Sequence, residues 1–127
     1  MFQIHLNRKG MSQRAVRCEV LTFSQVDAAE KMAASDIKET TTNAEFNSQV
    51  VRIGMEMMIK SVSEPTKEPG VAKWTDVTPA ELHLNWGKYF NAKDSAMLRA
   101  IHAQEHTVTK EDLDAITSGK VELAPEG

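Results

Sequence analysis

Two histidines and a glutamate near the end of the chain form the pattern most directly linked to chemistry. His102, Glu105 and His106 match H-x-x-E-H, an inverted zinc-protease motif. On a helix, the two imidazoles lie one turn apart on one face and can both reach a Zn²⁺ ion, with the glutamate as a base. A third ligand has to come from another element, with His83 and Asp112 as candidates. Since so short a pattern often arises by chance, ordinary solvated residues at a helix end are the favoured interpretation.

Cys18, the only cysteine of the chain, is a second candidate because a thiol beside a histidine can act as a nucleophile. Its neighbours alternate in polarity, so it falls on the inward side of a strand, where a small buried thiol is the ordinary outcome. The sequence has no Gly-rich phosphate loop and no nucleophile elbow. We therefore predict a protein that is not an enzyme and has no cofactor and no disulfide framework.

Length and composition fit one small globular domain. The chain has 127 residues, 41% of them hydrophobic and 26% charged, which is enough for one core but not for two. No apolar run approaches the length of a membrane span, and residues 1–20 lack the apolar region of a signal peptide. We expect a soluble protein of the cytoplasm with no membrane partner.

The charge is uneven along the chain. Residues 1–20 hold Arg8, Lys9, Arg14 and Arg17 against a single acid, a net charge of +3, whereas the whole chain carries −3. A nucleic-acid interface needs a denser basic face with interleaved aromatic side chains, and aromatic residues make up only 6% of this sequence. We expect no nucleic-acid partner and interpret the basic segment as a solvated hairpin tip.

The longest predicted element is a helix over residues 43–62. Thr42 followed by Glu45 marks its start, and Pro65 marks its end. The apolar positions recur at helical spacing and surround the second half: Phe46, Val50, Val51, Ile53, Met55, Met57, Met58, Ile59 and Val62. The three methionines suit either core filling, which is their commoner use, or a surface that accepts a partner.

Residues 1–21 predict a β-hairpin, because apolar and polar residues alternate on both sides of a polar turn at 7–14 that contains Gly10. The inward positions are Phe2, Ile4 and Leu6 on the first strand and Val16, Cys18 and Val20 on the second. Two strands alone are marginally stable in water. The apolar face of the hairpin must therefore lie on the helices or on another subunit.

The other helix starts pair a capping residue with an acidic or amide side chain three positions later. These pairs are Thr22 with Gln25, Thr78 with Glu81, Asn91 with Asp94, and Thr109 with Asp112. The predicted fold is α+β and mainly helical, with about five helices in a single domain. It consists of a β-hairpin over 1–21, a helical pair over 22–63, a loop over 64–76, a helical part over 77–119 that Gly119 ends, and a frayed tail over 120–127.

Two tryptophans and a glycine are the notable residues of the second half. We assign Trp86 to the core. Trp74, beside a loop rich in proline and glycine, is either an exposed contact residue or a lid over an apolar face. Gly87 lowers the stability of its predicted helix and indicates close helix packing there.

The order of parts over residues 2–62 follows a recognisable pattern. A hairpin enters VRCEVLTFSQVDAAEKMAA, a polar gap follows, and AEFNSQVVRIGMEMMIKSV comes next. This arrangement resembles the tail assembly chaperones of long-tailed bacteriophages, which similarly begin with a short hairpin, a capped helix start and a long apolar helix that ends at a Pro-containing loop. WTDVTPAEL and KYFNAKDSAML are also similar to stretches of such proteins, so the resemblance spans most of the chain as a pattern.

The resemblance implies a non-enzymatic protein of the host cytoplasm that coats the tape-measure protein and helps to recruit tail-tube subunits before leaving the virion. A longer product made by ribosomal frameshifting is common in that family. Such a role requires an exposed apolar groove, for which our candidates are Ile53, Met55, Met57, Met58 and Ile59, with Trp74 beside them. The basic hairpin then serves either self-association into a homo-oligomer or the binding of acidic client segments.

Two other classes of protein share the same size, acidity and lack of catalytic motif. A small phage-encoded inhibitor binds one host protein tightly and has no affinity for tail components. A minor structural subunit of the virion remains in purified particles, where mass spectrometry of peptides detects it.

Overall fold

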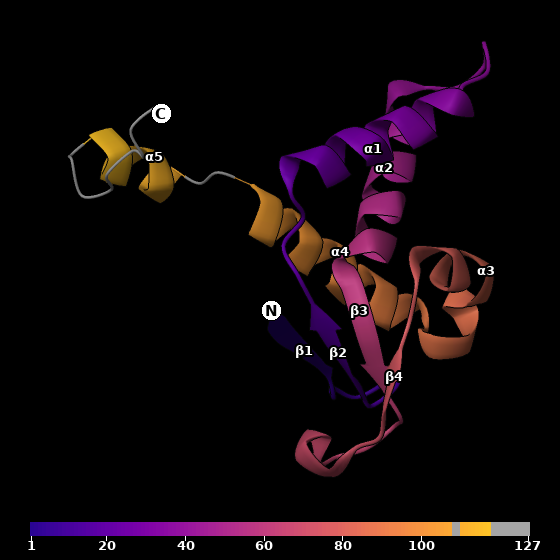
Figure 1. The fold of residues 1–127 in the computed structure, drawn as a ribbon, viewed down its shortest axis with the longest axis vertical. Coiled ribbons are helices and arrows are strands. Elements are labelled where there is room, and N and C mark those ends of the chain that lie inside the picture. Colours follow the sequence, from indigo (N-terminus) through magenta and orange to yellow (C-terminus); the bar gives the residue numbers. More distant parts are fainter. Residues whose placement is uncertain (108–109, 118–127) are drawn as a thin grey trace.

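The computed structural model describes residues 1–107 and 110–117, which form an α+β fold with an antiparallel four-stranded sheet (Figure 1). The strands are β1 (Phe2–Leu6), β2 (Arg14–Cys18), β3 (Ile59–Ser63) and β4 (Trp74–Asp76), in that order across the sheet. The helices are α1 (Phe23–Ser35), α2 (Asn43–Met58), α3 (Pro79–Tyr89), α4 (Ala92–His106) and α5 (Lys110–Thr117), and a 3₁₀ turn covers Pro69–Val71.

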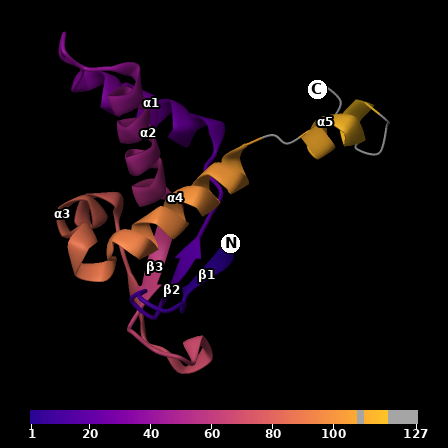
Figure 2. The same cartoon turned by 180° about the vertical axis from the view of Figure 1, so that it is seen from behind.

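The apolar face of the sheet and the helices enclose one core. α4 runs across this face, as seen from behind in Figure 2, and α1 packs against α2 beyond one end of the sheet. The predicted N-terminal hairpin is confirmed, with Ile4 opposite Val16 in its register. The inward placement of Val20 was wrong, because β2 ends at Cys18 and Val20 is 50% exposed. The core brings together side chains from the sheet, α2, α3 and α4, among them Leu6, Val16, Met58, Val62, Leu82 and Leu98.

The structure confirms a mainly helical α+β class but corrects the count of about five helices. Among the described residues, four helices, α1 to α4, pack with one another or with the sheet. The fifth helical segment, α5, lies apart from that body in both views. The predicted start of this segment at Thr109, its end at Gly119 and the tail over 120–127 lie outside the described residues.

The helix predicted over residues 43–62 is too long. It ends at Met58, and Ile59–Ser63 forms β3, which pairs with β2 through Cys18 opposite Ile59 and Val16 opposite Val62. Val62 falls at helical spacing after Met55, Met58 and Ile59, and Ile59–Ser63 is too short a segment to show strand alternation clearly, so the pattern did not distinguish a helix from a strand here. The predicted loop over 64–76 likewise contains the short strand β4, which extends the sheet beyond β3.

Helix starts were the most accurate predictions because caps act over three residues. Thr22 and Gln25 form the complete reciprocal capping box, and so do Asn91 and Asp94. The hydroxyls of Thr42 and Thr78 accept the backbone N–H groups three positions on. These contacts hold α2 and α3 at their predicted first residues.

Gly54, not Gly87, lies at a close approach of two helices. A Cβ atom added at Gly54 would lie 2.7 Å from Nε2 of His102 on α4, whereas one added at Gly87 would have no neighbour within 4 Å. The interpretation of Gly87 as a packing glycine was therefore wrong. The crossing of α2 and α4 instead depends on the missing side chain at Gly54.

We expect Gly54→Ala to destabilise the protein by about 1–3 kcal/mol, because the imidazole of His102 must move to make room. The matched control Gly87→Ala should be neutral or stabilise by up to about 1 kcal/mol, because alanine has the higher helix propensity and meets no neighbour. Urea unfolding followed by tryptophan fluorescence measures both. Equal effects of the two substitutions would contradict the close approach.

Candidate protein-binding groove

A groove of about 680 Å³ lies between the C-terminal end of α1, the second half of α2 and the first turns of α3. Its position follows from two local signals. α1 ends at Ser35, and α3 begins after the N-cap Thr78 with Pro79 in its first turn. The ends of these two helices leave part of α2 uncovered, and the groove lies over that part.

Apolar side chains from all three helices line the groove. Met32 of α1 is 52% exposed and Leu84 of α3 is 81% exposed, while Ile53 and Met57 of α2 are half-buried between them. A single exposed apolar residue on a surface needs no explanation, but several around one concavity indicate a place where another apolar surface binds.

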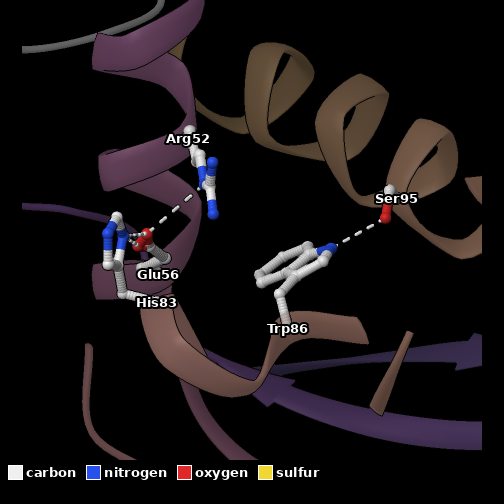
Figure 3. A network of polar contacts seen from close by, with 5 residues as sticks. All are labelled: Arg52, Glu56, His83, Trp86 and Ser95. Carbon is white, nitrogen blue, oxygen red and sulfur yellow. Dashed lines mark hydrogen bonds and ion pairs between the residues drawn. The ribbon is translucent and has the colours of Figure 1, made fainter. Parts of the chain in front are cut away.

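One of the polar residues that line the groove is a buried glutamate. Figure 3 shows its contacts. Glu56 of α2 is only 3% exposed, and its Oε1 and Oε2 lie 2.8 and 3.2 Å from Nδ1 of His83 on α3. Because a carboxylate only accepts, Nδ1 donates. The Nε of Arg52, one turn earlier on α2, lies 3.8 Å from Oε1. Burying a charge costs free energy unless it is paired, so this triad ties α3 to α2 beside the groove.

The six predicted partner-binding residues divide into three groups. Ile53 and Met57 line the groove. Met55, Met58 and Ile59 do not, because they are 6%, 0% and 1% exposed and fill the core. Helical periodicity did not separate the groove residues from the core residues. The chain changes from helix to strand after Met58, and β3 is enclosed on both faces.

Trp74 lies in β4, outside the groove, and is not a lid over it. Its ring is half-buried beneath the guanidinium of Arg17, whose carbon lies 3.8 Å from the ring centroid. Trp86 is partly buried against the core, as expected, and its Nε1 donates to the Ser95 hydroxyl at 2.8 Å (Figure 3). The two tryptophans thus have different roles, one stacked on a cation and one packed against the edge of the core.

Met32, Leu84, Glu56 and His83 were missed as groove residues, although the sequence contains signals for two of them. Leu84 falls two positions after the buried Leu82, so on a helix it points away from the core. Glu56 interrupts an apolar run, which a purely structural helix face would not need. The pairing with His83 has no sequence signal, since the partners are 27 positions apart.

The zinc motif does not form a metal site in the described residues. His106 accepts the backbone N–H of Leu21 at Nε2, at 2.8 Å, and its Nδ1 lies 2.7 Å from the carbonyl oxygen of His102, to which it donates. Both its nitrogens are therefore in use. No group of three His, Cys, Asp or Glu side chains in the described part of the chain is placed to hold a metal ion. His83, one candidate third ligand, pairs with Glu56 instead.

His102 is half-buried, and its burial lowers its pKa to about 4 from 6.5, with the neighbouring His106 as a smaller cause. Between pH 4 and pH 6.5, His102 binds a proton in the unfolded chain but not in the folded protein. Stability should therefore be full above pH 6.5 and fall as the pH drops towards 4. We expect the free energy of unfolding to fall by about 1–2 kcal/mol. This is less than the whole pKa shift would give, because solvent reaches part of the ring.

Urea unfolding between pH 7 and pH 4 tests this dependence. His102→Gln should remove that part of the pH dependence, whereas the same change at the exposed His5 should leave it intact. Identical pH profiles for His102→Gln and the unchanged protein would show that His102 does not exclude the proton.

Cys18 is fully buried, and burial raises the pKa of its thiol to about 12, with Lys60 opposing slightly. A thiolate is the reactive form of cysteine. The structure therefore favours the buried-thiol interpretation of this residue over a nucleophile.

Comparison of this chain with protein-family models, with curated proteins and with solved structures finds no match. Within residues 1–107 and 110–117, none of the helices combines the length and apolar character needed to cross a bilayer. The groove between α1, α2 and α3 is therefore the basis for a functional assignment.

Proposed function

We propose that this chain is a non-enzymatic binding protein that holds an apolar helical segment of a partner protein in the groove between α1, α2 and α3. The observation that supports this is the convergence of Met32, Ile53, Met57 and Leu84, from three helices, around one open concavity. Amphipathic helices bind in such grooves through a few apolar anchors. Methionine, unbranched and flexible, adapts to the shape of the bound segment.

Within this class, we propose the role that the sequence resemblance implies. The chain would act in the host cytoplasm as a tail assembly chaperone, with the tape-measure protein as the groove's client and tail-tube subunits as further partners. The order of hairpin, capped helix and long apolar helix over residues 2–58 supports this role, but the helix is followed by strand β3 and not directly by the Pro-containing loop of the family pattern.

Co-purification tests the groove. The chain is produced with candidate tape-measure and tail-tube proteins, alone and with Met57→Asp or Leu84→Asp. A charge placed in the groove should lower recovery of the client by about tenfold or more, because an apolar anchor would meet an unpaired carboxylate. The matched control is Val71→Asp, which puts the same charge on another exposed apolar residue, 72% exposed and outside the groove.

The outcomes separate the groove from the chaperone role. Equal recovery with the groove variants and the control would overturn the groove. Groove-dependent recovery of one host protein, without tail components, would overturn the chaperone role in favour of an inhibitor of that protein. Peptides of the chain in purified virions would favour a minor structural subunit.

A further inference from the structure

The turn between β1 and β2 lies against the junction of α3 and α4, although about eighty positions separate them in the chain. The Asn91 side chain donates to the Gly10 carbonyl at 2.8 Å, and Nζ of Lys93 donates to the Lys9 carbonyl. The Ser12 backbone N–H donates to Asp94 at 3.1 Å. These contacts hold two segments of the chain together as one surface.

Both segments contribute cations to this surface. Arg8, Lys9, Lys88 and Lys93 are exposed, and Arg14 is half-buried. The charged groups of Arg14 and Lys88 each lie 5.6 Å from the centroid of the Tyr89 ring. We call Arg8, Lys9, Arg14, Lys88 and Lys93, with Tyr89 among them, the basic patch.

None of the five cations of the basic patch forms an ion pair with a carboxylate of the described residues. The ion pairs found among the described residues join Lys31 to Asp27, and Arg52 and His83 to Glu56, all outside the patch. Arg14 donates to a backbone carbonyl, that of Ser63, at 2.9 Å. Asp94, the carboxylate beside the turn, is fully buried and accepts backbone N–H groups. The patch therefore presents a concentrated positive charge to solvent.

We propose that the basic patch binds an acidic peptide segment of a partner protein, at a surface separate from the groove. The protein carries −3 overall, so the residues outside these five cations are strongly acidic. A short acidic peptide contacts only the patch, whereas an extended nucleic acid would also approach the acidic remainder and be repelled. The half-buried ring of Tyr89, which the charged groups of Arg14 and Lys88 approach, adds an aromatic surface for contacts with the peptide.

Fluorescence anisotropy with a labelled short oligoglutamate peptide, in low salt, tests the patch. The full chain is compared with Lys9→Gln/Lys88→Gln/Lys93→Gln and with Lys31→Gln/Lys38→Gln/Lys110→Gln, which has the same net charge but changes lysines elsewhere. We expect the patch variant to bind the peptide about tenfold more weakly and to show a shallower salt dependence. The control should weaken binding by less than the patch variant does, because its lysines lie farther from the bound peptide and act through screened, long-range attraction.

A single-stranded oligothymidylate of equal charge is the second probe, and it should bind more weakly than the peptide. Tighter binding of the oligonucleotide would overturn the proposal in favour of a nucleic-acid surface. Equal losses of affinity for the peptide in the two lysine variants would also overturn the proposal. So would a lack of peptide binding by the unchanged chain. Met57→Asp should bind oligoglutamate like the unchanged chain, so failure of the groove and failure of the patch remain distinguishable.

Discussion

Met58→Asp is expected to prevent stable folding, whereas Met57→Asp should leave the fold intact. Met58 is 0% exposed within the core, and a carboxylate there would be buried without a partner, at a cost of more than about 4 kcal/mol. Met57 is half-buried at the open groove, where water can solvate the new charge. We expect Met57→Asp to lower the free energy of unfolding by about 1 kcal/mol.

Circular dichroism and urea unfolding of the two variants measure this contrast. A stable, fully helical Met58→Asp protein would show that the helix-to-strand change after Met58 is misplaced. The contrast also decides how client binding is tested. Substituting both methionines together would confuse loss of binding with loss of the fold, so Met57→Asp alone is the informative variant.

Asp94→Ala is expected to destabilise the protein by about 2–4 kcal/mol. Asp94 is fully buried, and its carboxylate accepts the backbone N–H groups of Ser12 at 3.1 Å and Asn91 at 2.9 Å. It therefore caps α4 and fixes the β1–β2 turn on the helix. Alanine would remove the cap and leave the N–H of Ser12 without this acceptor.

Thermal and urea unfolding of Asp94→Ala check this value against Asp27→Ala. Asp27 pairs with Lys31 on the surface, where such a pair contributes about 0.5 kcal/mol or less. Similar losses of unfolding free energy for the two substitutions would show that Asp94 does not hold the β1–β2 turn on α4. Asp94→Asn should be intermediate, because an amide oxygen can accept one of the two backbone donors but its nitrogen cannot replace the other acceptor.

Element starts and the two-strand hairpin were predictable from the sequence because their causes are local. Thr22 meets Gln25, and Asn91 meets Asp94, within one helical turn, whatever the rest of the chain does. The alternation in Phe2–Leu6 assigns one strand face to the core without reference to what covers it. The mainly helical α+β class follows from these elements.

The groove was only partly predictable. Periodicity located an apolar helix and singled out Ile53 and Met57, but it also selected Met55, Met58 and Ile59, which the core uses. Which side of α2 stays open depends on where α1 ends and where α3 begins. The Glu56–His83 pair depends on the same placement of α3 against α2.

The sequence by itself determined where the helices begin, which face of the hairpin is apolar and that Cys18 is buried, because each depends on residues within a few positions of one another. Only the tertiary structure decided that Ile59–Ser63 is a strand between β2 and β4, that Met58 is fully buried while Met57 is only half-buried, and that Lys9 lies beside Lys93. Those outcomes depend on contacts between segments far apart in the chain, and such contacts form only when the whole chain folds.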